Sequence, residues 1–337
     1  MKAVVCTEPG LLELVQRPSP EAPPAGWAAV RIRHVGICGT DYHIYEGKHP
    51  FLAYPRVIGH ELSGEIDEVN AGSTLAPGAK VVINPYISCD SCIACRQGKP
   101  NCCTSIRVLG VHTDGGLCER IVVPEKNLYP AGSLSLRDAA MVEFLAIGAH
   151  AVRRSLARAG SRALITGVGP IGLGAAIFAR IAGLDVTLLD SSAERLEFAK
   201  TSLGFPDGVT LSDRSAQQLM DLTNGDGFDV VFDATGNAAA IQAGFSFVAH
   251  GGAYVLVSVV KDAISFSDPE FHKREMMLIG SRNALRQDFE HVIASIEAGQ
   301  VPLDALATHK TTLERVTTDL PIWAHEKAGL IKAIVDL

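Results

Sequence analysis

Four cysteines that could share one metal ion lie close together in the chain, namely Cys89, Cys92, Cys95 and Cys103. Four thiolates at such short spacings can form a tetrahedron, which is typical of a structural zinc site. An iron–sulfur cluster is the main alternative, but the ferredoxin spacing requires a fourth cysteine where this chain has Lys99. Cys102 could replace Cys103 as the fourth ligand, so one thiol of that pair is spare. The spacing therefore predicts zinc at this cluster.

A second set of potential metal ligands comes from separate segments of the chain. Cys38, His60 and Glu61 offer a thiolate, an imidazole and a carboxylate, and mixed ligands with one open position are typical of catalytic zinc. Another acidic residue, Glu143, lies in an apolar run, where a buried carboxylate is costly unless it is paired or binds a metal. Spacing alone leaves open the alternative that Cys38 and His60 are ordinary core residues.

A glycine motif of the form Gly-x-Gly-x-x-Gly is made by Gly167, Gly169 and Gly172. It lies between a strand-like run and a helical pattern, where backbone N–H groups and the helix N-terminus can bind a pyrophosphate. The next strand-like run ends at Asp190, whose carboxylate would bind ribose hydroxyls and repel a 2′-phosphate, which favours NAD over NADP. Arg195 is close enough in sequence to stack on adenine or to meet a phosphate.

The pattern of apolar runs and turn residues differs between the two parts of the chain that contain these motifs. The first 150 residues contain short apolar stretches between closely spaced Pro and Gly turn signals, which predicts antiparallel β structure with a barrel-like core. From about residue 150, strand-like runs alternate with helical segments (163–166, 171–182, 185–189 and 193–203), which predicts βαβ units around a parallel sheet. The predicted class is therefore α/β, with a β-rich domain and a doubly wound domain.

Composition limits the possible functions. The 337 residues suggest two domains, and the net charge of −7 disfavours a nucleic-acid partner. The longest uncharged apolar run, 163–179, is rich in glycine and too short to cross a bilayer, so no membrane partner is expected. Glu8 and Pro9 interrupt the N-terminus too early for a signal peptide. These features predict an intracellular protein.

Together, the motifs resemble those of the zinc-dependent medium-chain alcohol and polyol dehydrogenases, in particular the sorbitol and threonine dehydrogenase branch. The stretches 54–61 and 108–112 are similar to bacterial sugar-acid members such as the L-galactonate oxidoreductases. The resemblance implies a GroES-like β-barrel catalytic domain at 1–148 and 283–337, with a Rossmann domain at 149–282 between them. It also implies NAD, a catalytic and a structural zinc ion, and a homodimer or homotetramer, and the intracellular location expected above is taken as cytoplasmic.

The same resemblance implies a role for each matching residue. Cys38, His60 and Glu61 would bind the catalytic zinc, with Glu143 at the metal directly or through a water molecule, and Asp41 would orient His60. A relay through Thr40 and His43 would carry the substrate proton away. Contacts with NAD are expected from the glycine motif and from Ile171, Asp190, Arg195, Val257, Val259 and Arg282.

Three positions depart from the polyol dehydrogenase pattern. Ile44 replaces an aromatic residue, Phe144 replaces a proline, and Asn283 replaces a tyrosine beside Arg282. These changes leave the metal chemistry intact but put a sorbitol-like pocket in doubt. Arg282 and His112 could instead face a substrate carboxylate.

The predicted reaction is therefore the reversible oxidation of a secondary alcohol of a polyol or sugar acid by NAD. A threonine dehydrogenase and a simple-alcohol dehydrogenase are alternatives within the same family. A non-catalytic, NAD-responsive binding protein would not need the Thr40–His43 proton relay. A zinc-free quinone reductase of the same superfamily would lack both sets of metal ligands.

Overall fold

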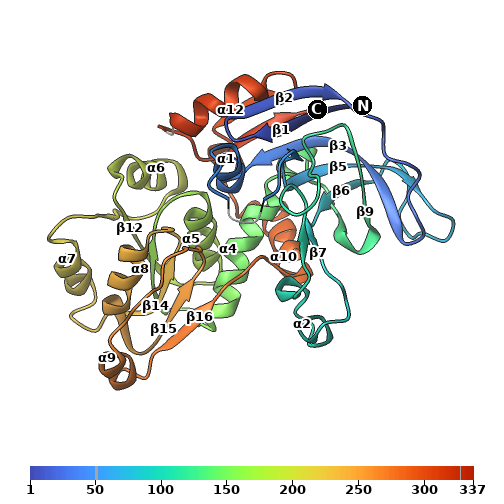
Figure 1. Ribbon diagram of the computed structural model, residues 1–337. Helices are drawn as coiled ribbons and strands as arrows, with labels where there is room; N and C mark the ends of the chain where they lie inside the picture. Colours follow the sequence, from blue (N-terminus) through green and yellow to red (C-terminus); the bar gives the residue numbers. More distant parts are fainter. Residues whose placement is uncertain (50–51, 327) are drawn as a thin grey trace. The chain divides into compact units, whose positions relative to one another are not determined.

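The computed structural model describes residues 1–49, 52–326 and 328–337. The chain divides into two compact units (Figure 1). Unit 1 contains Met1–Glu143, Leu285–Gly299 and Leu306–Leu337, and unit 2 contains Phe144–Ala284 and Gln300–Ala305. Residues from the end of the chain therefore complete the unit that the N-terminal segment begins. In the described part of the chain, no helix is both long and apolar enough to cross a membrane.

Unit 1 is built on a seven-stranded sheet whose central strand is β3 (Trp27–Ile37). Strand β3 pairs with β5 (Glu61–Val69), β9 (Arg120–Pro124) and β18 (Ala333–Asp336), all antiparallel. The sheet continues through β6 (Lys80–Ile83) and β10 (Leu128–Pro130) on one side and β17 (His309–Thr312) on the other. A smaller sheet contains β1 (Lys2–Glu8), β2 (Leu11–Gln16) and β4 (Arg56–Val57), and β7 (Tyr86–Ile87) pairs with β8 (Arg107–Val108).

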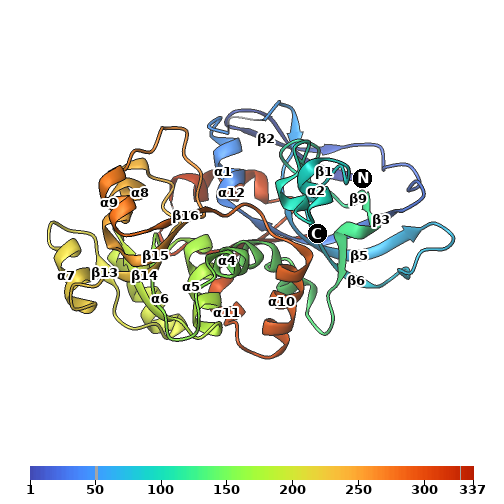
Figure 2. The ribbon, with the colours of Figure 1, turned by 90° about the horizontal axis from the view of Figure 1, so that it is seen from below.

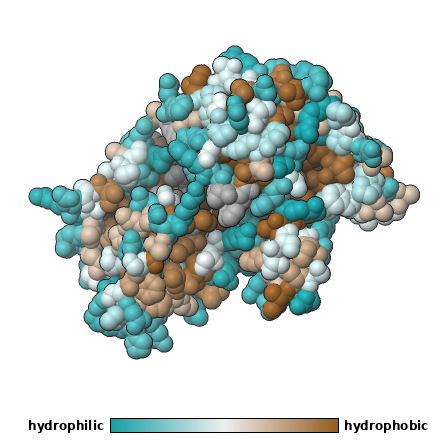
Figure 3. All heavy atoms as spheres, in the orientation of Figure 1, coloured by the Kyte–Doolittle hydropathy of each residue, from teal (hydrophilic) through white to brown (hydrophobic). Residues whose placement is uncertain are grey.

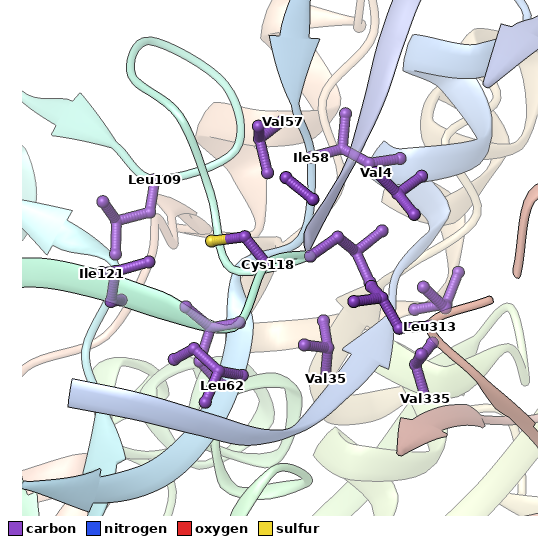
Figure 4. Packing of buried hydrophobic residues seen from close by; sticks show 14 of the residues in the cluster. Val4, Val35, Val57, Ile58, Leu62, Leu109, Cys118, Ile121, Leu313 and Val335 are labelled. Atoms are coloured by element: carbon purple, nitrogen blue, oxygen red, sulfur yellow. The ribbon is translucent and has the colours of Figure 1, made fainter. Parts of the chain in front are cut away.

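The core of unit 1 holds these strands together. Val35 of β3, Leu62 of β5 and Val335 of β18 are fully buried in one hydrophobic cluster (Figure 4). Burying each such side chain contributes about 1.5–3 kcal/mol relative to leaving it exposed. Gly64 allows β5 to approach β3, because a Cβ atom there would lie only 2.3 Å from the Arg31 carbonyl oxygen. Unit 1 has three short helices, α1 (Gly39–Tyr45), α2 (Ile93–Arg96) and α3 (Leu136–Ala139), among the described residues. Its two longer helices there are α10 (Arg286–Glu297) and α12 (Val316–His325).

Unit 2 contains a six-stranded parallel sheet in the order β13-β12-β11-β14-β15-β16. This is the doubly wound order of the Rossmann fold, in which ligands bind at the carboxyl ends of the strands. Its strands are β11 (Arg162–Thr166), β12 (Asp185–Asp190), β13 (Val209–Thr210), β14 (Phe228–Asp233), β15 (Val248–Leu256) and β16 (Met277–Gly280). Thr166 pairs with Leu189 and Asp233, and Asp233 pairs with Leu256, so these carboxyl ends lie side by side.

Helices cover both faces of the parallel sheet. In the view of Figure 2, α8 lies on one side of the strands and α5 and α6 lie on the other. The helices in and beside unit 2 are α4 (Val142–Ser155), α5 (Pro170–Ile181), α6 (Ala193–Leu203), α7 (Ser215–Leu222), α8 (Ala238–Gly244), α9 (Asp268–Lys273) and α11 (Leu303–Leu306). The edge strand β16 exposes Met277 and Leu278, and Figure 3 shows hydrophobic surface in this region. The predicted α/β class, with a parallel doubly wound sheet, is confirmed.

Candidate active site and metal centres

A possible metal site forms where β3 ends and β5 begins. Donor atoms of Cys38, His60 and Glu61 all lie within 4.8 Å of one another, although these residues come from two separate segments. The pairing of Gly36 with Glu61 brings the segments together. A Cβ atom at Gly36 would lie 2.2 Å from a Glu61 carboxylate oxygen, so the glycine leaves room for that carboxylate. Mixed sulfur, nitrogen and oxygen donors of this kind suit zinc.

Asp41 organises the chain around this group. Its buried carboxylate accepts hydrogen bonds from the backbone N–H groups of Cys38, at 2.9 Å, and Gly59, at 3.1 Å. It also lies 3.7 Å from His60 Nδ1, which has no hydrogen-bond partner among the described residues. Burial lowers the pKa of His60, but the negative charges of Asp41 and Cys38 outweigh this effect and raise it well above the usual value. His60 thus lies among acidic groups, and its Nδ1 is buried beside Asp41. The donor atoms of Cys38, His60 and Glu61 are close enough together to bind one cation.

The carboxylate of Glu61 is bound by a buried lysine. Lys332 Nζ donates to both Glu61 oxygens, at 2.6 and 2.7 Å, and both side chains are fully buried. It also lies 3.3 Å from the carbonyl oxygen of Ile37. Burial lowers the pKa of Lys332, but the Glu61 charge overrides this and raises it, so the ammonium stays charged. Lys332 is not among the residues predicted from the sequence, although a lysine within the apolar C-terminal run 331–335 is a signal that could have indicated it.

Glu143 lies in the first turn of α4, near this group but outside the three residues whose donor atoms are closest together. The Tyr86 hydroxyl donates a hydrogen bond to Glu143 Oε1. Burial raises the pKa of Glu143 to about 7, and burial together with the Glu143 charge raises the pKa of Tyr86 well above its usual value. The two acidic residues are thus held differently, Glu61 by a lysine and Glu143 by a neutral hydroxyl. Tyr86 was also missed.

The predicted proton relay lies on α1, which begins directly after Cys38. Thr40 is half-buried and its hydroxyl oxygen lies 3.9 Å from Cys38 Sγ. His43 lies three residues further along the same helix and is exposed. Residues three apart share one helix face, so this helix carries one polar group beside the candidate metal site and a second one at the surface.

The cysteine cluster is compact. Donor atoms of Cys89, Cys92, Cys95 and Cys103 lie within 4.8 Å of one another, whereas Cys102 is exposed and outside the group. Backbone hydrogen bonds from Cys95 and Thr104 lower the pKa of the Cys92 thiol to about 5, while burial and the Cys92 sulfur raise that of Cys95. Four thiols so close together cannot all ionise unless a cation neutralises them. The donor set therefore fits zinc.

The glycine turn joins β11 to α5 in unit 2. Gly167 has a φ of 86°, and a Cβ atom at Gly172 would lie 1.8 Å from the Gly167 carbonyl oxygen. At Gly169, by contrast, the nearest atom to an added Cβ is Arg195 Nη1 at 3.9 Å, so the space in front of the helix N-terminus is open. This opening allows a phosphate to approach the free N–H groups of α5. Ile171 follows in the first turn of the helix and is half-buried.

Asp190 is the last residue of β12, and its side chain is hydrogen-bonded to the glycine turn. Its carboxylate accepts hydrogen bonds from the N–H groups of Val168, at 2.5 Å, and Ser192, at 2.7 Å, and Arg195 lies 3.9 Å away. Each oxygen therefore retains a lone pair for a further donor. The carboxylate can therefore accept a hydrogen bond from a ribose hydroxyl of a dinucleotide.

The remaining predicted residues lie at strand ends or in turns. Val257 and Val259 follow β15, with Val257 half-buried and Val259 exposed, and Arg282 is exposed just beyond β16. Asn283 has a left-handed backbone with a φ of 52°, which asparagine tolerates better than most residues. His112 belongs to unit 1, where its Nδ1 accepts a hydrogen bond from the Val108 N–H.

Comparison with known proteins decides the family. A profile described as "Alcohol dehydrogenase GroES-like domain" matches residues 24–133, and one described as "Zinc-binding dehydrogenase" matches residues 170–298. The chain belongs to the zinc-binding alcohol dehydrogenases. It is 42% identical to L-galactonate-5-dehydrogenase of Escherichia coli K12, over 92% of this chain and 91% of that protein. It is 34% identical to 2-dehydro-3-deoxy-L-galactonate 5-dehydrogenase of Pseudoalteromonas atlantica, over 84% and 83% of the two chains.

A solved structure supports the same assignment. The Escherichia coli CFT073 alcohol dehydrogenase rspB, crystallised with NADH, has a TM-score of 0.93 and 30% identity, covering 100% of this chain and 99% of that chain. The predicted resemblance, the enzyme class and the use of zinc and NAD are confirmed at the level of the family. The protein is therefore an NAD-dependent zinc oxidoreductase that acts on a CH–OH group.

Proposed function

We propose that this dehydrogenase oxidises a secondary hydroxyl of a sugar acid of the L-galactonate class. The observation that carries the proposal is the 42% identity, over nearly the whole chain, to a protein named L-galactonate-5-dehydrogenase. A second relative is named for position 5 of a related deoxy sugar acid. Both names denote a substrate that carries a carboxylate. This agrees with an exposed arginine, Arg282, which lies just beyond β16.

The catalytic zinc would be held by Cys38 and His60 together with Glu61 or Glu143. When bound there, zinc supplies a Lewis acid that lowers the pKa of a substrate hydroxyl. Thr40, whose hydroxyl is 3.9 Å from Cys38 Sγ, would take the substrate proton while it releases its own hydroxyl proton to the relay. His43, exposed on the same helix, passes that proton to solvent.

The cofactor would be held by unit 2. NAD supplies the hydride acceptor when bound, and the chain's own residues determine its position. The open space at Gly169 admits the pyrophosphate, and the Asp190 carboxylate binds the ribose hydroxyls. A negative charge at Asp190 repels a 2′-phosphate, which supports NAD over NADP.

The structural zinc would be held by the four clustered cysteines of the loop around α2. Its role is to fix a loop that has little hydrophobic core of its own, since α2 contains no buried residue.

A homodimer or homotetramer stays a prediction. We expect copies of the chain to pair along the exposed edge of β16. Light scattering tests whether the protein forms a homodimer or a homotetramer.

A substrate panel tests the proposed substrate class. We expect NAD reduction with L-galactonate to be faster than with the neutral polyol galactitol, L-threonine or a simple alcohol. Arg282→Met should raise KM for L-galactonate more than for galactitol, because only the acid carries a carboxylate. A preference for L-threonine or for simple alcohols would replace the sugar-acid proposal with one of the other members of the family.

Variants of single thiols test the metal assignment. Cys38→Ser should abolish turnover but leave NADH binding intact, since Cys38 belongs to unit 1 and the glycine turn to unit 2. Cys102→Ser is the matched control, because this thiol is exposed and outside both donor groups. A fully active Cys38→Ser enzyme contradicts the assignment. NADH binding without turnover of any substrate by the parent would favour a binding protein.

A further inference from the structure

A buried carboxylate that the proposed mechanism does not use lies in the middle of the cofactor edge of unit 2. Asp233 is the last residue of β14 and is fully buried. Its side chain accepts hydrogen bonds from the hydroxyls of Ser258, at 2.7 Å, Thr235, at 3.0 Å, and Thr166, at 3.1 Å. The Thr235 N–H adds a fourth, at 3.2 Å. Within the described part of the chain, no ion pair to a basic side chain neutralises it.

The hydrogen-bond donors come from three different strand ends. Thr166 ends β11 immediately before Gly167, Thr235 lies in the loop after β14, and Ser258 lies two residues beyond the end of β15. The register places Thr166 opposite Asp233 and Asp233 opposite Leu256. Asp233 therefore connects three neighbouring loops at the edge where a doubly wound sheet binds its ligand.

The segment 257–259 has few other anchors. Strand β15 ends at Leu256, so its ladder with β14 stops there. Beyond that point, the N–H groups of Val257 and Ser258 donate to the Asp233 carbonyl, at 2.9 and 3.2 Å, and the Ser258 hydroxyl donates to its carboxylate. The next residue, Val259, is 88% exposed. The described bonds of this segment thus converge on one residue.

The choice of aspartate over asparagine has a physical consequence. A carboxylate only accepts hydrogen bonds, so the Ser258 and Thr235 hydroxyls must point their protons at it. The Thr166 hydroxyl shares its proton between the Asp233 carboxylate and the Phe232 carbonyl oxygen, both at 3.1 Å. Hydrogen bonds to a charged acceptor are also stronger than neutral ones. An asparagine amide keeps one acceptor oxygen but presents N–H groups in place of the other, so the three loops would lose part of the hydrogen bonding that joins them.

We propose that Asp233 is a positioning residue that, through Ser258, fixes the segment 257–259 for the nicotinamide half of the cofactor. Through Thr166 it also fixes the glycine turn that binds the pyrophosphate. The inference rests on the proposed cofactor site and on the expectation, from the family resemblance, that Val257 and Val259 lie at the nicotinamide half of NAD. It predicts that the two halves of the dinucleotide depend on different hydrogen bonds of one carboxylate.

The test compares two ligands of the purified full-length enzyme, NADH and ADP-ribose, which lacks the nicotinamide ring. Ser258→Ala removes one bond to Asp233, and we expect NADH to bind about tenfold more weakly, with ADP-ribose within about twofold of the parent. Ser258→Thr keeps the hydroxyl and should restore most of the NADH affinity. Asp233→Asn should weaken the binding of both ligands, because it also weakens the hydrogen bond from Thr166, the residue directly before the glycine turn.

Ser246→Ala is the matched control in the same unit, since this hydroxyl bonds only to the Ala243 carbonyl in the described structure. It should change neither affinity. Unchanged NADH binding in Ser258→Ala overturns the inference, and so does an equal loss of NADH and ADP-ribose, which would indicate a general loss of folding. If the parent itself binds neither ligand, the proposed cofactor site fails and this inference fails with it.

Discussion

Breaking the buried pair between Lys332 and Glu61 should destabilise unit 1 strongly. Lys332→Met leaves the Glu61 carboxylate buried without its cation, and Glu61→Leu leaves the Lys332 ammonium without its anion. Both side chains are fully buried and their charged atoms are 2.6 and 2.7 Å apart. Removing one partner of such a pair costs about 3–5 kcal/mol. At roughly 2–4 °C per kcal/mol for a unit of this size, the midpoint of thermal unfolding should fall by about 10 °C.

The double variant, Lys332→Met with Glu61→Leu, separates charge from packing. Replacing both charges with apolar side chains removes the uncompensated ion, so we expect unfolding within about 2 kcal/mol of the parent. Thermal unfolding followed by circular dichroism measures all three variants. Lys2→Met is the control, because its ion pair with Glu314 is similarly short, at 2.7 Å, but exposed. Exposed pairs contribute less than about 1 kcal/mol.

Two results would refute this reasoning. A Lys332→Met variant that unfolds within about 1 kcal/mol of the parent would mean that Glu61 is neutralised by something other than Lys332. A double variant that loses the sum of the two single effects would mean that packing, and not charge, dominates. Zinc content measured on the same samples shows whether release of Glu61 changes metal retention at the Cys38 and His60 site.

Three other predictions concern the metal cluster and the cofactor turn. Cys92→Ser should lose the zinc of the cysteine cluster but retain that of the active site, as measured by metal analysis, and should unfold at lower temperature. Gly172→Ala should destabilise unit 2, because the new Cβ would meet the Gly167 carbonyl at 1.8 Å, whereas Gly169→Ala should keep its unfolding midpoint but bind NADH more weakly. Asp190→Ala should reduce the preference for NAD over NADP by about tenfold in binding titrations. Retention of full NAD preference in that variant would contradict the role of the carboxylate.

The fold class could be predicted because its signals are local. The alternation of strand-like and helical runs after residue 150 specifies a parallel sheet, and the structure confirms it in unit 2. The glycine motif is also local: the steric need for Gly167 and Gly172 arises within one turn. The four cysteines lie within one loop, so their spacing was sufficient to expect that they would meet.

The missed residues depend on contacts that are distant in sequence. Lys332 reaches Glu61 only because the C-terminal strand β18 pairs with β3, which no periodicity indicates. Tyr86 contacts Glu143 from the two-residue strand β7, and Asp233 accepts hydrogen bonds from hydroxyls at three strand ends. A charged residue within an apolar run is the signal in the sequence that Glu143, Lys332 and Asp233 share, and only Glu143 is predicted from it above.

The most direct test of the central claim is the rate of NADH formation by the zinc-loaded enzyme with L-galactonate and with galactitol, measured side by side. We expect NADH formation to be clearly faster with L-galactonate than with galactitol, and we expect no NADH formation by the Cys38→Ser variant. Equal or greater activity on the neutral polyol would contradict the sugar-acid assignment, and turnover by Cys38→Ser would contradict the metal chemistry.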